Sequence, residues 1–300
     1  MSGDPHRAAR EYGDVLAARE AILGPDDPAV LATRNNVASW RGQAGDAAGA
    51  VAQFDTLVQD TTTALGPDHP NTLTARGNLA LWRGHAGDPA GAAAAFEELL
   101  RDEELVLGPG HPQTLITRNN VAVWRLDAGD IRGAAQAFDS LVRDQERLLG
   151  PDHPDTLTTR NNRALLWGQT GNPGAAMTEF EKLLSDLTRV LGPEHPRTLA
   201  TRGNLAFWQG KADDPTAAAD AFDQLRRIHE RVLGPDHPDT LTTRHNLALW
   251  QGYAGDPAAA AAAFAELVPD TERVLGPEHP GTAKTRRELT RWRRAADSSR

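Results

Sequence analysis

The sequence Leu-Gly-Pro-Asp-His-Pro occupies residues 65–70 and returns at a fixed distance along the chain. Close copies begin at Leu107, Leu149, Leu191, Leu233 and Leu275, and a more divergent copy begins at Leu23. Each copy lies 42 residues after the previous one. A fixed period of roughly 20–50 residues is typical of a solenoid or another repeat array.

Each copy of this stretch has the residues that end one helix and begin the next. Gly66 favours the left-handed backbone that follows a helix, and Pro67 prevents the helix from continuing. Pro70 suits the first turn of a new helix, for which Asp68 or His69 would be the N-cap. The stretch therefore predicts a linker between two helices in every repeat.

Within one repeat, apolar residues recur at helical spacing. Leu79 and Trp82 lie on one predicted helix, and Phe96 lies on a second, with Asp88 as the cap between them. Ala80 and Ala92 are small, which lets these helices approach closely. Two such helices form an αα-hairpin, which buries its apolar stripes by stacking on the next hairpin.

The fixed period divides the chain into full and partial repeats. A half-repeat helix is expected at 5–22, because Tyr12 matches Phe54 one period later, and a capping helix is expected at 278–296. Residues 1–300 are thus predicted to form a single solenoid of fourteen helices. The six full repeats are expected at 26–67, 68–109, 110–151, 152–193, 194–235 and 236–277.

Composition excludes several classes of protein. The chain has no cysteine, so disulfides and thiolate metal sites are excluded. No apolar run approaches the ~20 residues of a membrane span, and no leader is recognisable, so a soluble, cytoplasmic protein is expected. The net charge of −9 argues against general binding of nucleic acid. The abundance of Ala, Gly, Pro and Arg suggests a GC-rich bacterial genome.

The residues of each hairpin resemble a known family. Asn78-Leu79-Ala80, Gly87-Asp88, Ala92 and Phe96 look like the tetratricopeptide repeat, and the period and linker resemble the long-helix variant found in kinesin light chains. Similar arrays occur in actinobacterial signalling proteins, often behind a nucleotide-binding switch domain. The resemblance covers residues 5–296 and implies an all-α, right-handed solenoid. The chain departs from the family where an aromatic residue usually follows the Trp82 position, since Arg83 stands there.

The resemblance also implies a concave groove lined by the first helix of each hairpin. The family's asparagine in this stripe hydrogen-bonds the backbone of an extended peptide, a task for which an amide has both donor and acceptor. The alternative is that these asparagines join adjacent helices. The asparagine column is Asn36, Asn78, Asn120, Asn162, Asn204 and Asn246.

Two further rows flank the asparagine column at helical spacing. The apolar row is Leu81, Val123, Leu165, Phe207 and Leu249. The variable row is His85, Asp127, Gln169, Lys211 and Tyr253. A regular backbone-reading column beside a variable polar row suits selective recognition of a peptide, so we predict that these three rows form the peptide-binding site.

The repeated histidines and arginines each allow a chemical and a structural interpretation. Equivalent residues of stacked hairpins lie roughly 8–10 Å apart, so the linker histidines cannot converge on one metal ion. We expect them to cap or pack the linkers, and we expect neither a metal nor a cofactor. The arginine column could bind anions, or it could form salt bridges to acidic residues that repeat with the same period. We favour the salt bridges. The column consists of Arg34, Arg76, Arg118, Arg160, Arg202, Arg244 and Arg286.

The remaining features indicate a binding protein. No nucleotide-binding or catalytic motif is present, so an enzyme is a distant alternative. The basic residues 284–300 are expected to form a polar end cap, with a nucleic-acid tail as the alternative. Pro269 stands inside a second helix, which is expected to break near Val268.

We therefore predict a non-catalytic scaffold that binds an extended peptide or a disordered protein segment. The alternative is a regulatory sensor that acts with a switch ATPase or a transcription factor. The partial repeats at the two ends could also pair between copies of the chain.

Overall fold

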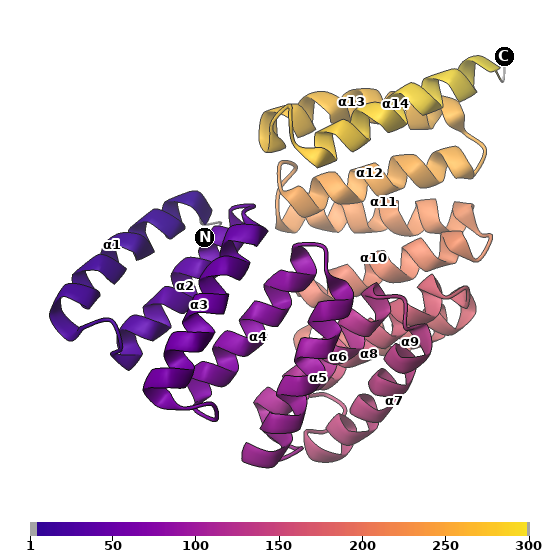
Figure 1. Cartoon of the computed structure of the whole chain (residues 1–300). Coiled ribbons are helices and arrows are strands. Elements are labelled where there is room, and N and C mark those ends of the chain that lie inside the picture. The colour runs from indigo at the N-terminus through magenta and orange to yellow at the C-terminus, as the bar shows by residue number, and fades with distance from the viewer. Residues whose placement is uncertain (1–4, 299–300) are drawn as a thin grey trace. The chain divides into compact units, whose positions relative to one another are not determined.

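The computed structural model describes residues 5–298, which contain fourteen α-helices and no β-strand (Figure 1). Backbone contacts divide the chain into two compact units, Met1–Pro151 and Asp152–Arg300. The border falls where the third and fourth repeats are expected to meet. Within each unit, every helix packs on the helices that precede and follow it in the chain. The predicted all-α array of helical hairpins is confirmed.

The first unit contains seven helices. They are α1 (Pro5–Leu23), α2 (Pro28–Gln43), α3 (Ala47–Leu65), α4 (Pro70–His85), α5 (Pro89–Val106), α6 (Pro112–Asp127) and α7 (Ile131–Leu148). The even-numbered helices are the first helices of successive repeats. The first helices α2 and α4 of successive repeats also contact each other directly.

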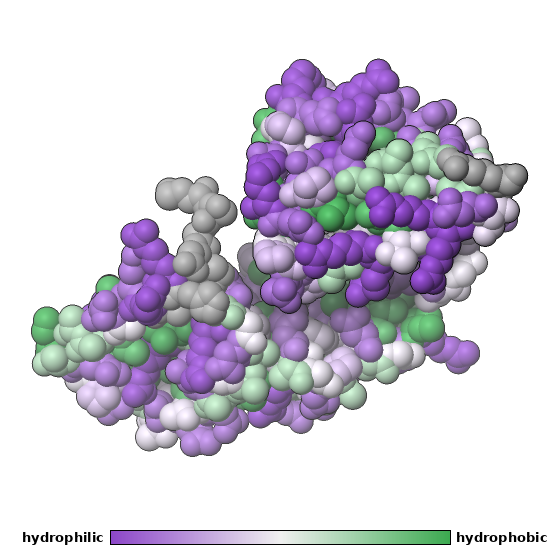
Figure 2. All heavy atoms as spheres, turned by 90° about the horizontal axis from the view of Figure 1, so that it is seen from above, coloured by the Kyte–Doolittle hydropathy of each residue, from purple (hydrophilic) through white to green (hydrophobic). Residues whose placement is uncertain are grey.

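The second unit repeats the arrangement. Its helices are α8 (Pro154–Gln169), α9 (Pro173–Leu191), α10 (Pro196–Lys211), α11 (Pro215–Val232), α12 (Pro238–Tyr253), α13 (Pro257–Leu275) and α14 (Pro280–Ser298). The first helices α10, α12 and α14 contact one another in turn. Hydrophilic residues cover most of the face of this unit that Figure 2 shows, and a narrower band of hydrophobic residues lies between them.

The linker at residues 65–70 is held by one backbone conformation and two hydrogen bonds. Gly66 has a φ of 94°, in the left-handed region that favours glycine. The backbone N–H of Asn71 donates a hydrogen bond to Nδ1 of His69 (3.1 Å), so His69 is the N-cap of α4 and Asp68 is not. The hydroxyl of Thr72 donates to the carbonyl of Gly66 (2.8 Å). Together these contacts fix the start of α4 relative to the end of α3.

The core of every hairpin is built around one phenylalanine of its second helix. These six side chains are at most 1% exposed, and they are Phe54, Phe96, Phe138, Phe180, Phe222 and Phe264. The predicted alanine pair, Ala80 and Ala92, is fully buried where α4 and α5 cross. Its equivalents are buried in the other five hairpins. Small residues at the crossing allow the close approach that brings the phenylalanine into the core.

Successive hairpins are joined by a tryptophan that lies against a glycine of the preceding repeat. A Cβ atom added to any of these glycines would overlap the tryptophan ring. The pairs are Gly42 with Trp82, Gly84 with Trp124, Gly168 with Trp208, Gly210 with Trp250 and Gly252 with Trp292. In the sequence, Leu126 replaces the glycine of the third repeat and Leu166 replaces the tryptophan of the fourth. The glycine therefore provides the space that the indole occupies.

The prediction that this second helix breaks near Val268, before Pro269, is wrong. Helix α13 runs without interruption from Pro257 to Leu275 with Pro269 inside it. Pro269 is exposed, so its ring and the lost backbone hydrogen bond lie on the side of the helix that faces away from the core. Leu267 and Thr271, on the other side, remain buried and hold the helix against its neighbours.

Candidate functional site

The three predicted rows lie on the first helices as a graded surface. The asparagine column is half-buried except for the exposed Asn36, and the five members of the apolar row are half-buried. All five members of the variable row are exposed. The rows therefore form a surface on which the residues that vary between repeats are the most accessible to a partner.

The asparagine column has two kinds of member. The side-chain amide of Asn78 donates to the Oδ1 of Asn35 (2.8 Å), and that of Asn204 donates to the Oδ1 of Asn161 (3.3 Å). Asn78 and Asn204 therefore do join adjacent helices, as the structural interpretation held. For Asn120 and Asn246, the residue of the preceding repeat that is equivalent to Asn35 is a glycine, Gly77 or Gly203. Glycine has no side chain that could accept this hydrogen bond.

A hollow of about 500 Å³ opens between α10, α11 and α12. Its walls include Asn204, Phe207 and Asn246 from the predicted rows. Gly203 contributes to the opening because it has no side chain, whereas other repeats have an asparagine at this position (Asn35, Asn119 and Asn161). The hollow is thus the place where an asparagine without a side-chain partner, an aromatic side chain and an open volume coincide.

Sequence reasoning missed part of this hollow. Gly203 and the buried His229 line it, and His229 Nδ1 lies 2.9 Å from the hydroxyl of Thr243. Burial lowers the pKa of His229, which favours its neutral form. Gly203, which matches Gly77, and His229 can be seen when the repeats are aligned, but only the packing of α11 against α12 brings them into one site.

Two members of the variable row, His85 and Tyr253, pack on the tryptophans that join the hairpins. The ring of His85 lies 5.3 Å from that of Trp82 and 5.4 Å from that of Trp124, measured between centroids. Tyr253 makes the same kind of contacts with Trp250 and Trp292, at 5.4 and 5.5 Å. These contacts hold the two aromatic side chains in place, and the guanidinium of Arg291 also lies over the ring of Tyr253, 5.2 Å from its centroid.

The linker histidines are caps. In each of the last six linkers, Nδ1 accepts a hydrogen bond from the backbone N–H two residues later, and Asp27 does the same in the first linker. Among residues 5–298, no three His, Cys, Asp or Glu side chains are grouped so that they could hold a metal ion. The histidines are His69, His111, His153, His195, His237 and His279.

The arginine column forms the expected salt bridges. Arg34, Arg76, Arg118, Arg160 and Arg244 each lie 2.7–2.8 Å from an aspartate of the second helix in their own repeat. Arg286 pairs instead with Glu272 (2.7 Å). Arg202 is the exception, because its Nε is buried without a hydrogen-bond partner.

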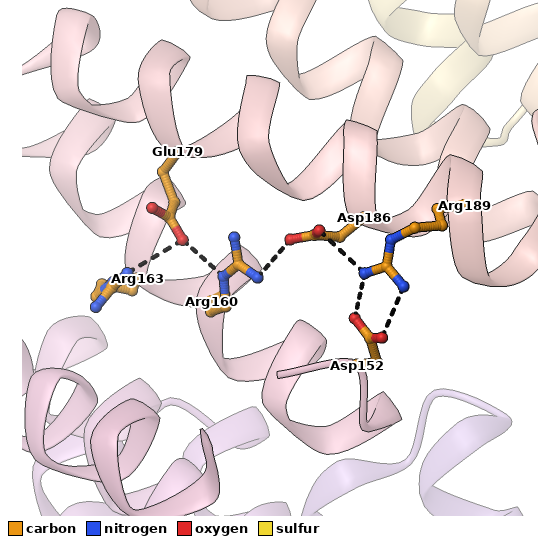
Figure 3. Close-up of polar contacts among 6 residues, drawn as sticks. All are labelled: Asp152, Arg160, Arg163, Glu179, Asp186 and Arg189. Atoms are coloured by element: carbon orange, nitrogen blue, oxygen red, sulfur yellow. Dashed lines mark hydrogen bonds and ion pairs between the residues drawn. The ribbon is translucent and has the colours of Figure 1, made fainter. Parts of the chain in front are cut away.

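The ion pairs of the fourth repeat extend into a chain of six residues (Figure 3). Arg160 donates to Glu179 (2.9 Å) and to Asp186 (2.8 Å), and Arg163 also donates to Glu179 (3.1 Å). Arg189 continues the chain from Asp186 to Asp152 of the linker. Arg160 and Glu179 are buried, so this network fixes the packing of α8 on α9 rather than offering charges to a partner.

His245 is a buried titratable group that is independent of the ion pairs. Its ring lies 5.1 Å from that of Phe264, and its Nδ1 lies 3.3 Å from the hydroxyl of Thr285. Burial, with a smaller effect of Lys284, lowers its pKa from 6.5 to about 4. The folded chain therefore holds this imidazole neutral at pH values where the unfolded chain protonates it.

We expect acid to destabilise the second unit through His245. Because the unfolded chain gains this proton near pH 6.5 and the folded chain gains it only near pH 4, stability is lost as the pH falls between these values. The loss between about pH 7 and about pH 4.5 should reach about 2 kcal/mol. Urea unfolding of the wild type and of His245→Asn, which installs the residue found at Asn35 and Asn161, measures it. Parallel pH profiles for the two proteins would contradict the assignment.

Comparison with known proteins identifies the repeats. One family model described as "Tetratricopeptide repeat" matches residues 36–102 and 211–269, and a second with the same description matches 114–155 and 156–197. The chain belongs to the tetratricopeptide-repeat family. Such repeats generally mediate protein–protein interactions, and scaffolds of this family are generally non-catalytic.

Solved structures share the tetratricopeptide fold at low sequence identity. A protein from Podosopora anserina described as a kinesin light chain with nearly identical TPR-like repeats is 22% identical, with a TM-score of 0.59 over 68% of this chain and 97% of its own. A Rap protein complexed with competence and sporulation factor is 12% identical, with a TM-score of 0.52 over 100% of this chain and 90% of its own.

A third structure has the tetratricopeptide array as one part of a longer chain. This is PH0952 from Pyrococcus horikoshii, a signal transduction ATPase with numerous domains and a tetratricopeptide repeat sensor. It is 10% identical, with a TM-score of 0.66 over 89% of this chain and 40% of its own. No protein with curated annotation matches the chain significantly. Among the helices described, none combines the length and the apolar character that crossing a membrane requires.

Proposed function

We propose that the chain is a protein-interaction scaffold whose first helices bind an extended peptide or a disordered protein segment. The observation that carries this proposal is the hollow between α10, α11 and α12, which joins Asn204, Asn246 and Phe207 in one site of about 500 Å³. Asn246 has both donor and acceptor available for a peptide backbone, and Phe207 provides an aromatic wall.

The contacts around Phe207 support its role as the anchor. Its ring lies edge-on to Trp208 and Trp250, at centroid distances of 5.1 and 5.9 Å, and the ammonium of Lys211 lies 5.7 Å from its centroid. The side chain is thus held before a ligand arrives, which reduces the entropy that binding costs. A peptide with an apolar side chain beside an acidic one would fit Phe207 and Lys211 together.

The other asparagines of the column extend the proposed groove along each unit. Each neutral hydrogen bond contributes only about 0.5–1.5 kcal/mol, so a single asparagine cannot hold a peptide. Several asparagines and an apolar anchor together could reach micromolar affinity, roughly −8 kcal/mol. Because Asn78 and Asn204 already bond to neighbouring asparagines, we assign the larger share of backbone recognition to Asn120 and Asn246.

A peptide-display selection against the intact chain tests this proposal. We expect the selected peptides to bind several-fold more weakly to Asn246→Ala and about tenfold more weakly to Phe207→Ala, with melting temperatures close to that of the wild type. Glu181→Ala, an exposed change on the second helix α9, is the matched control and should bind normally. Unchanged binding by folded groove variants would place the site elsewhere, and unfolding of Asn246→Ala would make this asparagine structural.

A sensor acting with a switch ATPase is the second candidate. It is motivated by the similarity to the tetratricopeptide sensor of PH0952, which at 10% identity concerns the fold alone. Under this proposal, the same groove would report its ligand to an ATPase partner. Co-purification with an ATPase encoded next to this chain would support the sensor, and binding of the selected peptides without such a partner would favour the scaffold.

A further inference from the structure

Arg202 lacks the aspartate that accompanies the other arginines of its column. In five repeats that aspartate stands 26 residues after the arginine, but Ile228 occupies this position in the fifth repeat. The half-buried Ile228 packs against the apolar core of α10 and α11. The fifth repeat therefore keeps the cation of the ladder and replaces the anion with an aliphatic side chain.

The other positions that supply carboxylates to this column are also uncharged around Arg202. Glu20 reaches Arg34 from 14 residues before it, and Thr188 stands at that distance from Arg202. Glu179 reaches Arg160 from 19 residues after it, and Ala221 stands there in the fifth repeat.

One acidic residue of α11, two positions after Ala221, is already engaged. Asp223 of α11 pairs with Arg226 (2.8 Å) and with Arg227 (2.7 Å). These pairs hold the pKa of Asp223 below its ordinary value, with the hydrogen bond from Arg226 as the main cause. Asp223 is therefore not a spare partner for Arg202.

Arg202 faces an open hollow of about 210 Å³ between α9, α10 and α11. Leu184 and Leu205 supply apolar wall, and Gln209 and Gln224 supply side-chain amides. The Nε of Arg202 is buried there without a partner. The Arg202 side chain is half-buried, and a buried N–H without an acceptor is costly, whereas an anion that enters the hollow gains a charge-assisted hydrogen bond.

We propose that this hollow binds a carboxylate of a protein partner, which takes the place of the missing aspartate. The guanidinium of Arg202 binds the carboxylate, and the amides of Gln209 and Gln224 donate additional hydrogen bonds. The leucine side chains accommodate a short aliphatic group next to the carboxylate. The hollow involves two second helices and one first helix, whereas the proposed peptide groove runs along the first helices.

The test uses small probes and the intact chain. N-acetylglutamic acid α-amide presents a side-chain carboxylate, N-acetylleucine presents a terminal carboxylate, and N-acetylleucinamide is the neutral control. Binding is followed by the NMR signal of the Arg202 Nε–H group, which Arg202→Gln identifies by removing it. We expect a saturable shift with at least one carboxylate and none with the amide, and the preferred probe indicates which kind of carboxylate the partner presents.

Variants distinguish this site from general attraction of anions. Ile228→Asp restores the partner found in the other repeats and should weaken probe binding about tenfold or more, since it competes for the same guanidinium. Arg244→Gln, which removes an arginine already paired with Asp270, is the matched control and should leave the shift of Arg202 unchanged.

Several results would overturn the proposal. These are a shift of the same size with chloride at equal ionic strength, no saturable shift with either carboxylate, and equal binding by wild type and folded Ile228→Asp. If Ile228→Asp does not fold, calorimetric titration of the folded Arg202→Gln decides. Loss of carboxylate binding in that variant supports the site, and unchanged binding excludes it. Peptides selected on the groove should bind Arg202→Gln normally, so the two proposals can fail independently.

Discussion

Replacing Glu179 with alanine is expected to destabilise the fourth repeat by about 3 kcal/mol. Glu179 is buried beside the buried Arg160 and also accepts a hydrogen bond from Arg163. Removing one member of a buried ion pair leaves a desolvated charge, at a cost of about 3–5 kcal/mol. We expect the lower end of this range, because Asp186 still accepts a hydrogen bond from Arg160.

Urea unfolding and amide hydrogen exchange of α8 and α9 measure this effect. Asp152→Ala is the matched control, because it removes an exposed carboxylate from the same chain of ion pairs and should cost about 1 kcal/mol or less. Glu179→Gln keeps an oxygen that can accept from Arg160 and should fall between the two. Equal effects for Glu179→Ala and Asp152→Ala would show that burial does not determine the strength of this network.

Replacing Gly210 with alanine is expected to destabilise the joint between the fifth and sixth repeats by about 3 kcal/mol. In an ordinary helix this change is favourable by about 1 kcal/mol, so the expected sign is reversed. The added Cβ would lie 2.5 Å from the ring of Trp250, which is 4% exposed and has no free space into which it can move. The two hairpins must separate, and each repeat of a solenoid depends on its neighbours.

Gly203→Ala is the matched control for this joint, because it lies in the same helix. Its Cβ would meet Leu225 at an ordinary contact distance of 3.5 Å, so it should be neutral or stabilising by up to about 1 kcal/mol. Thermal and urea unfolding of both variants provide the comparison. Gly210→Ala combined with Trp250→Leu should recover part of the loss. The natural sequence has the same kind of combination, because Leu126 stands at the glycine position of the third repeat and Leu166 stands at the tryptophan position of the fourth. A harmless Gly210→Ala would contradict the role of this contact.

The sequence alone predicted the helical array because its determinants are local and repeated. Gly66 and Pro70 fix a linker through backbone conformation, and Phe96 and Leu99 place an apolar stripe through helical period alone. The same local chemistry predicted the histidine caps and the pairing of the arginine column. The peptide-binding role of the three rows remains a proposal, because a periodic row of polar residues is compatible with both binding and packing.

The sequence determined the fourteen helices, their caps and the residues of their cores, because each of these depends on neighbours within one or two turns. Only the tertiary structure decided which periodic residues are already engaged. Asn204 meets Asn161 while Asn246 faces Gly203, and Arg160 meets two carboxylates while Arg202 meets none. It also showed that Pro269 is tolerated, because its ring lies on the exposed side of α13. These differences arise from contacts between helices, which bring together side chains that lie far apart in the sequence.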